Sequence, residues 1–157
     1  MKHVNVALFV PHAGCPHQCS FCNQKTISGS IKPLTPEDVT AACDIAKNGG
    51  VTRESSEIAF FGGSFTAVDR DYMVSLLEAA KPYIDGGYFG GIRISTRPDA
   101  IDDERLEILK KYHVTSIELG AQSMDDDVLE INRRGHTAKD VENASRLIKS
   151  YRSEERR

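Results

Sequence analysis

The sequence contains no tryptophan, only 7% aromatic residues, no basic excess and no long apolar run. Its 157 residues carry a net charge of −3, which gives no general attraction to nucleic acid or to an anionic membrane. No stretch reaches the roughly 18 consecutive apolar residues of a membrane helix, and the first residues lack the apolar segment of a secretory signal. These absences predict a cytoplasmic protein without a membrane partner, in which any contact with RNA is local.

The composition that is present is that of a globular domain, with 39% hydrophobic and 27% charged residues. A chain of this size buries roughly 68–70% of the surface of its unfolded form, which is enough for one core. We therefore expect one domain over residues 1–151 and a charged tail over residues 152–157.

Short apolar runs rich in β-formers alternate with capped helical segments along the chain. The predicted strands cover residues 4–10, 57–61, 91–95 and 114–119. The predicted helices cover residues 36–48, 69–83, 102–112, a short segment opened by Ser123 as N-cap, and 137–151. Four strand-helix units predict an α/β fold with a parallel sheet, either a partial parallel β/α barrel or an open doubly wound sheet. In both architectures, ligands bind at the carboxyl ends of the strands.

Three of the four cysteines lie within eight residues, just past the first predicted strand. The spacing of Cys15, Cys19 and Cys22 allows three thiolates to wrap one corner of a [4Fe-4S] cluster and leaves one iron without a protein ligand. A structural zinc ion with His12 or His17 as fourth ligand is the alternative, although zinc sites usually use two separated ligand pairs. Unligated buried cysteines are a third interpretation. Cys43 stands in the first predicted helix beside alanines and is predicted to be a core residue.

Candidate ligand contacts follow the other three strands. Gly62, Gly63 and Ser64 follow the second strand, where residues without side chains let backbone approach a ligand. Arg97 follows the third strand, with Ser95 and Thr96 as weaker candidates, and its guanidinium could meet a carboxylate. Glu118 and Gln122 flank the end of the fourth strand as candidate cofactor or substrate contacts.

Two further groups of polar residues have less specific interpretations. His113 precedes the fourth strand on the opposite edge of the sheet, which favours a structural role. The basic corner formed by Arg133, Arg134 and His136 could hold a phosphate or an acidic side chain, or be solvated.

The C-x3-C-x-aromatic-C pattern of residues 15–22 resembles the radical-SAM superfamily. The resemblance implies a [4Fe-4S] cluster on the three cysteines and S-adenosylmethionine chelated at the open iron, with Phe21 as a cofactor neighbour. It implies an electron donor such as flavodoxin or ferredoxin, and reductive cleavage to a 5'-deoxyadenosyl radical. Residues 62–64 resemble the motif that holds the methionine moiety, where many members carry glutamate at the position of Ser64.

Residues 96–99, 117–123 and 134–137 together look like the radical-SAM domain of the Elongator catalytic subunit and its shorter bacterial relatives. The last two segments are also similar to oxygen-independent coproporphyrinogen III oxidases. For the Elongator relatives, the resemblance implies modification of the wobble uridine of tRNA through a separate acetyltransferase domain. This chain has the shorter cysteine spacing, and its residues after the predicted domain are not expected to form an acetyltransferase.

Radical-SAM cores usually contain six strand-helix units, whereas four are predicted here. The chain is therefore expected to be a truncated, N-terminal part of such a core, with another chain as a candidate to cover the edge of the fourth strand. The competing hypothesis is a non-catalytic metal-binding module, either a zinc-stabilised RNA-binding fold or an inactive remnant that keeps a cluster.

Overall fold

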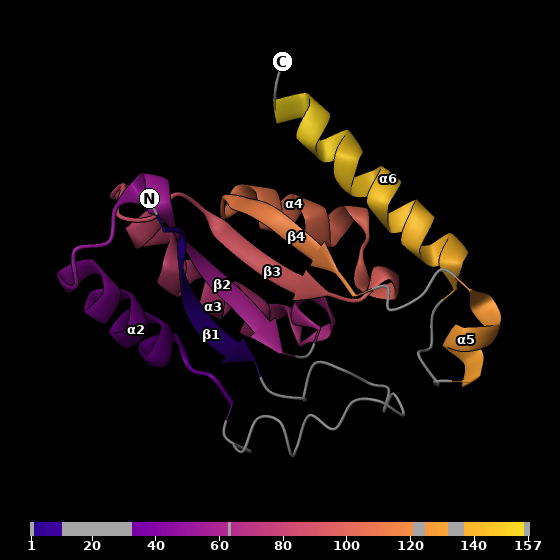
Figure 1. The fold of residues 1–157 in the computed structure, drawn as a ribbon, viewed down its shortest axis with the longest axis horizontal. Coiled ribbons are helices and arrows are strands. Elements are labelled where there is room, and N and C mark those ends of the chain that lie inside the picture. Colours follow the sequence, from indigo (N-terminus) through magenta and orange to yellow (C-terminus); the bar gives the residue numbers. More distant parts are fainter. Residues whose placement is uncertain (1, 11–32, 63, 121–124, 132–136, 156–157) are drawn as a thin grey trace.

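Four parallel strands form one sheet, and their order in space is their order in the sequence (Figure 1). The strands of this computed structural model are β1 (Val4–Val10), β2 (Ser56–Gly62), β3 (Ile92–Thr96) and β4 (Val114–Leu119). The structure describes residues 2–10, 33–62, 64–120, 125–131 and 137–155. A sequential order has no reversal, and right-handed crossovers then place the helices on one face. The fold is a partial parallel β/α barrel, and the doubly wound alternative does not apply.

The helices alternate with the strands as the sequence predicts. They are α2 (Pro36–Asn48), α3 (Arg70–Asp85), α4 (Asp103–Lys111), the short α5 (Asp126–Ile131) and α6 (Ala138–Glu155). The last helix continues past Tyr151, its predicted end, to Glu155. In the part of the chain that the structure describes, no helix is both long and apolar enough to cross a membrane.

Side-chain caps set the starts of these helices. Thr35 and Asp38 form a reciprocal capping box at α2, with Pro36 in the first turn. Thr137 and Asp140 form the same pair at α6. The predicted cap at Ser123 lies outside the described residues.

The two faces of the sheet differ in what covers them. On one face, alternate strand residues such as Leu8, Phe60 and Ile94 are buried against the helices and form the core. On the other face, Ala7 and Phe61 are exposed. No helix of the described residues lies over this face of the sheet (Figure 1). We call this second face the open face, because it leaves strand side chains accessible next to the carboxyl ends.

Candidate functional site

The candidate site lies at the carboxyl ends of the four strands. The register pairs Val10 with Gly62 and Thr96 with Leu119, so the strand ends meet at one edge. Four predicted site residues fall within the described part of the chain: Gly62, Ser64, Arg97 and Glu118. The others lie outside it, namely Cys15, Cys19, Phe21, Cys22, Gly63 and Gln122.

Gly62 is required by its neighbour in the sheet. Its φ is +117°, and a Cβ placed on it would lie 2.5 Å from the carbonyl oxygen of Val10 and 3.0 Å from the Phe9 ring. The missing side chain therefore lets β1 and β2 approach at the point where β1 enters the cysteine-containing segment. This is a packing reason for the glycine, in addition to the predicted approach of a ligand.

A buried hydroxyl cluster joins the ends of β2 and β3. The Ser64 and Thr96 hydroxyl oxygens lie 2.8 Å apart, and Thr66 is hydrogen-bonded to Thr96. The backbone N–H of Arg97 donates to Ser64 Oγ at 3.1 Å, and the N–H of Gly120 donates to the Thr96 carbonyl at 2.9 Å. We define Ser64, Thr66 and Thr96 as the hydroxyl cluster, which also reaches the end of β4 through Gly120.

The hydroxyl cluster changes the role that can be given to Ser64. Ser64 is 0% exposed and its hydroxyl is hydrogen-bonded within the protein, so the side chain holds the strand ends together. Any contact of Ser64 with a ligand would then be made by its backbone. Thr66 was not among the predicted site residues, although two hydroxyls flanking Phe65 after a Gly-Gly pair are a usable signal.

Arg97 is held at the end of β3 by its own turn. The residue is 3% exposed, and its guanidinium donates from Nε to Asp99 Oδ1 at 2.9 Å and from Nη2 to Oδ2 at 3.4 Å. The Asp99 carboxylate thus pairs with Arg97 within the turn, and the predicted contact of Arg97 with a ligand stays a prediction. This two-bond geometry holds the guanidinium plane in one orientation at the strand-end edge.

Glu118 belongs to a row of charged side chains on the open face. Its carboxylate accepts from Arg93 Nη1 at 2.9 Å and from Ser95 Oγ at 3.3 Å. Arg93 also donates from Nε to Glu57 at 2.5 Å, and His3 Nε2 lies 3.2 Å from the same Glu57 oxygen. Arg93, Glu57 and His3 were not among the residues predicted for the site. Charged residues at alternate positions of otherwise apolar strands could have identified the first two.

Two aromatic rings lie beside the entry to the cysteine-containing segment. Phe9 of β1 and Phe61 of β2 make an edge-to-face contact, with ring centroids 5.3 Å apart and planes at 78°. Phe61 is 41% exposed, so this pair gives the open face an apolar wall near the strand ends.

The two residues predicted to be structural have that character. Cys43 is fully buried in the core, and burial, with a contribution from Asp44, raises the pKa of its thiol to about 12. A thiol that stays protonated is a poor metal ligand. His113 has a φ of +64° at the start of β4 and lies 3.4 Å from Asp85, away from the strand ends.

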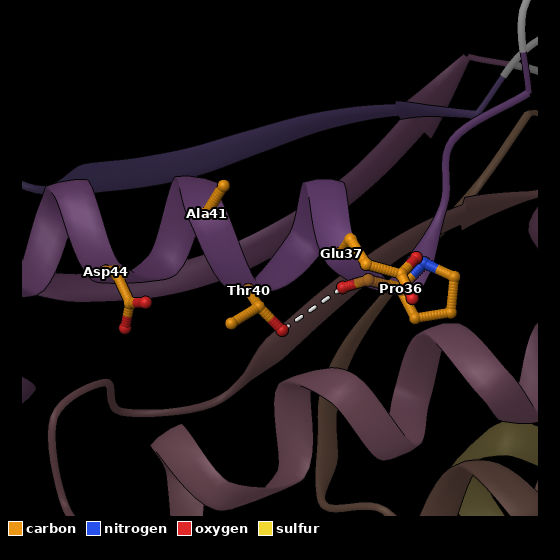
Figure 2. A pocket seen from close by; sticks show the side chains of 5 residues that line it. All are labelled: Pro36, Glu37, Thr40, Ala41 and Asp44. Atoms are coloured by element: carbon orange, nitrogen blue, oxygen red, sulfur yellow. Dashed lines mark hydrogen bonds between the residues drawn. The ribbon is translucent and has the colours of Figure 1, made fainter.

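An open groove of about 370 Å³ runs along α2 (Figure 2). Among the described residues its walls come from α2 alone: Pro36, Glu37, Thr40, Ala41 and Asp44. Thr40 donates to the Pro36 carbonyl at 3.2 Å, and Asp44 accepts from the Tyr83 hydroxyl at 2.6 Å. Two of its polar groups are therefore already bonded within the protein, and the groove does not belong to the strand-end site.

Replacing Gly62 by alanine should destabilise the protein and loosen the β1–β2 strand ends. A left-handed φ costs alanine about 1–2 kcal/mol, and the clash with the Val10 carbonyl adds to it. The matched control is Gly50→Ala, because Gly50 also has a positive φ of +83° but nothing lies within 4 Å of its Cβ position. Urea denaturation should give the larger loss for Gly62→Ala. Equal losses in the free energy of unfolding would show that β1 makes no steric contact with a side chain at position 62.

The parallel sheet and the one-sided helix layer define a partial β/α barrel, and the polar strand ends form a candidate ligand site at its carboxyl edge. The profile of the Radical SAM superfamily matches residues 9–155, and the chain belongs to this superfamily. The membership confirms the resemblance found in the cysteine pattern.

Known relatives include tRNA-modifying and haem-related proteins. A tRNA uridine(34) acetyltransferase of Dehalococcoides mccartyi (strain CBDB1) is 24% identical over 93% of this chain and 39% of its own length. The heme chaperone HemW of Bacillus subtilis (strain 168) is 28% identical, over 81% of this chain and 34% of its own. A solved structure of archaeal Methanocaldococcus infernus Elp3 has a TM-score of 0.62 at 19% identity, covering 92% of this chain and 35% of that one. The chain thus spans between a third and two fifths of these relatives.

Proposed function

We propose that this chain holds a [4Fe-4S] cluster on Cys15, Cys19 and Cys22 and binds S-adenosylmethionine at the carboxyl ends of its strands. The observation that carries the proposal is that the cysteine segment follows β1 in the chain, and that β1 ends at the edge where the candidate site was predicted. Three thiolates suit a cluster with one open iron, and membership of the radical SAM superfamily supports both groups.

The protein side of the reaction is binding, orientation and shielding. When bound, the cluster supplies the single electron that splits S-adenosylmethionine into methionine and a 5'-deoxyadenosyl radical, and a flavodoxin- or ferredoxin-type donor supplies that electron. We assign the methionine moiety to the backbone of residues 62–64, with Phe21 beside the cluster. Arg97, Glu118 and Gln122 line the rest of the pocket.

The strand-end geometry supports this assignment in three ways. The hydroxyl cluster fixes the ends of β2 and β3, so the backbone after β2 is held before any ligand arrives. Glu118 is accessible on the open face, with 57% of its side chain exposed. The aromatic pair of Phe9 and Phe61 offers an apolar wall that would exclude water from one side of the site.

We further propose that the substrate is a tRNA and that the protein acts in the cytoplasm. The tRNA uridine(34) acetyltransferase among the relatives supports this class of substrate. Since the chain's net charge is −3, the RNA contact would be local. The basic corner of Arg133, Arg134 and His136, which lies outside the described residues, is the candidate for it.

Anaerobic reconstitution with iron and sulfide tests the proposal. We expect about four irons per chain, and 5'-deoxyadenosine and methionine on adding S-adenosylmethionine and a strong reductant. Iron is measured colorimetrically, and the products by liquid chromatography. Bound zinc instead of iron, or a full cluster without cleavage, would support the non-catalytic metal-binding module.

A further inference from the structure

The charged row on the open face connects the start of β1 with the end of β4. It consists of His3, Glu57, Arg93 and Glu118, and Arg93 is its centre. Arg93 bridges two carboxylates with different nitrogens, Nε to Glu57 and Nη1 to Glu118. Because the guanidinium is a rigid planar fork, fixing one end of the bridge fixes the direction of the other.

From Glu57 to Glu118, side-chain exposure increases toward the predicted site. The Glu57 side chain is 10% exposed, that of Arg93 is 33% exposed, and that of Glu118 is 57% exposed. Glu57 is therefore the buried anchor and Glu118 the accessible end. His3, whose side chain is 53% exposed, is a second partner of the anchor on the opposite side from Arg93.

Two donors on β3 orient the Glu118 carboxylate. One oxygen accepts from Arg93 and the other from Ser95, which is also the register partner of Glu118. A carboxylate has about four acceptor positions, so capacity for a ligand remains on the open face. The hydrogen bond to Glu57, together with the bond to Glu118 and the charge of both carboxylates, raises the pKa of Arg93, so the guanidinium stays charged.

We propose that Arg93 is a positioning residue for the ligand site. Its hydrogen bond to buried Glu57 fixes its guanidinium, the guanidinium orients the Glu118 carboxylate, and Glu118 contacts the ligand. This inference rests on the proposed function, because it concerns how the site binds S-adenosylmethionine. Arg93 itself lies deeper than Glu118 and acts through it. Removing Arg93 should therefore weaken ligand binding when the Glu118 carboxylate is present, and have little effect when Glu118 has been replaced.

A double-mutant cycle on S-adenosylmethionine affinity tests this dependence. The affinity of the reconstituted protein is measured by equilibrium dialysis for wild type, Arg93→Met, Glu118→Gln and the double variant. We expect Arg93→Met to weaken binding about tenfold in the wild-type background and less than about twofold in the Glu118→Gln background. Arg93→Lys should fall between, because lysine keeps the charge but has no fork to hold both carboxylates.

Removing Arg93 also takes the guanidinium from a nearly buried carboxylate, so folding is checked separately. The variant Arg93→Met/Glu57→Gln removes both charges and is measured beside Arg93→Met, with far-UV circular dichroism and iron content for each protein. If the Arg93→Met/Glu57→Gln variant is folded, contains iron and loses as much affinity as Arg93→Met, the result supports the positioning role.

Two results would overturn the positioning role alone, and a third would overturn the proposed function as well. A tenfold loss in both Glu118 backgrounds means that Arg93 acts by another route, and no loss in the wild-type background means that it does not act on the ligand. In both cases the proposed function stands. A wild-type protein that holds four irons but no S-adenosylmethionine contradicts the proposed function and the positioning role together.

Discussion

Cys19→Ala should remove the iron from the reconstituted protein, from about four atoms per chain to nearly none. The reason is chemical, since two thiolates leave a cubane cluster with two irons lacking protein ligands. Cleavage of S-adenosylmethionine should disappear with the iron. The helical signal in far-UV circular dichroism should persist, because the core is built from residues of β1 to β3 and of the helices that cover them. Iron analysis and circular dichroism on the same sample check both expectations.

Cys43→Ala is the matched control for this experiment. Cys43 is 0% exposed in α2 and belongs to the core, and its pKa of about 12 keeps the thiol protonated at neutral pH. Its replacement should leave the iron content unchanged. If Cys43→Ala lost the iron and Cys19→Ala kept it, the assignment of the cluster to the segment after β1 would be wrong.

Phe60→Ala should lower the free energy of unfolding by about 3–5 kcal/mol, which is the usual cost of emptying a buried aromatic site. Phe60 is 0% exposed and stacks on Phe65 with ring centroids 4.8 Å apart. The change therefore creates a cavity where β2 meets the turn that carries Ser64 and Thr66. Urea denaturation measures the loss.

Phe61→Ala, the next residue of the same strand, is the control for Phe60→Ala. Phe61 points to the open face and is 41% exposed, so its loss should cost less than about 1 kcal/mol. Comparable losses for the two variants would mean that the open face is as closely packed as the core.

The sequence was sufficient for the order and type of the elements because local chemistry encodes them. Capping boxes at Thr35 and Thr137 and alternating apolar strand residues are signals that act over a few positions. No local sequence signal distinguishes a barrel from a doubly wound sheet. The difference depends on which strands pair, and only the sequential pairing of β1 to β4 decides it.

The site was predictable in position but not in its internal bonding. The strand-end rule placed Gly62, Ser64, Arg97 and Glu118 at one edge, as the structure has them. The rule could not indicate that the Ser64 hydroxyl turns inward to Thr96, since the two residues are 32 positions apart in the chain. The row through Arg93 was missed for the same reason, because its partners lie on neighbouring strands. The ligand roles of all the predicted site residues stay predictions: Cys15, Cys19, Phe21, Cys22, Gly62, Gly63, Ser64, Arg97, Glu118 and Gln122.

The hydroxyl cluster has an electrostatic consequence for any electron transfer at this edge. Ser64, Thr66 and Thr96 join the strand ends with neutral groups, so the join adds no net charge to its surroundings. A carboxylate in the same place would oppose the arrival of an electron by on the order of 1–2 kcal/mol at a separation of about 10 Å, for an effective dielectric constant near 20. The strand ends are thus held rigid by groups that neither titrate near neutral pH nor add a charge that would shift the reduction potential of a nearby redox centre.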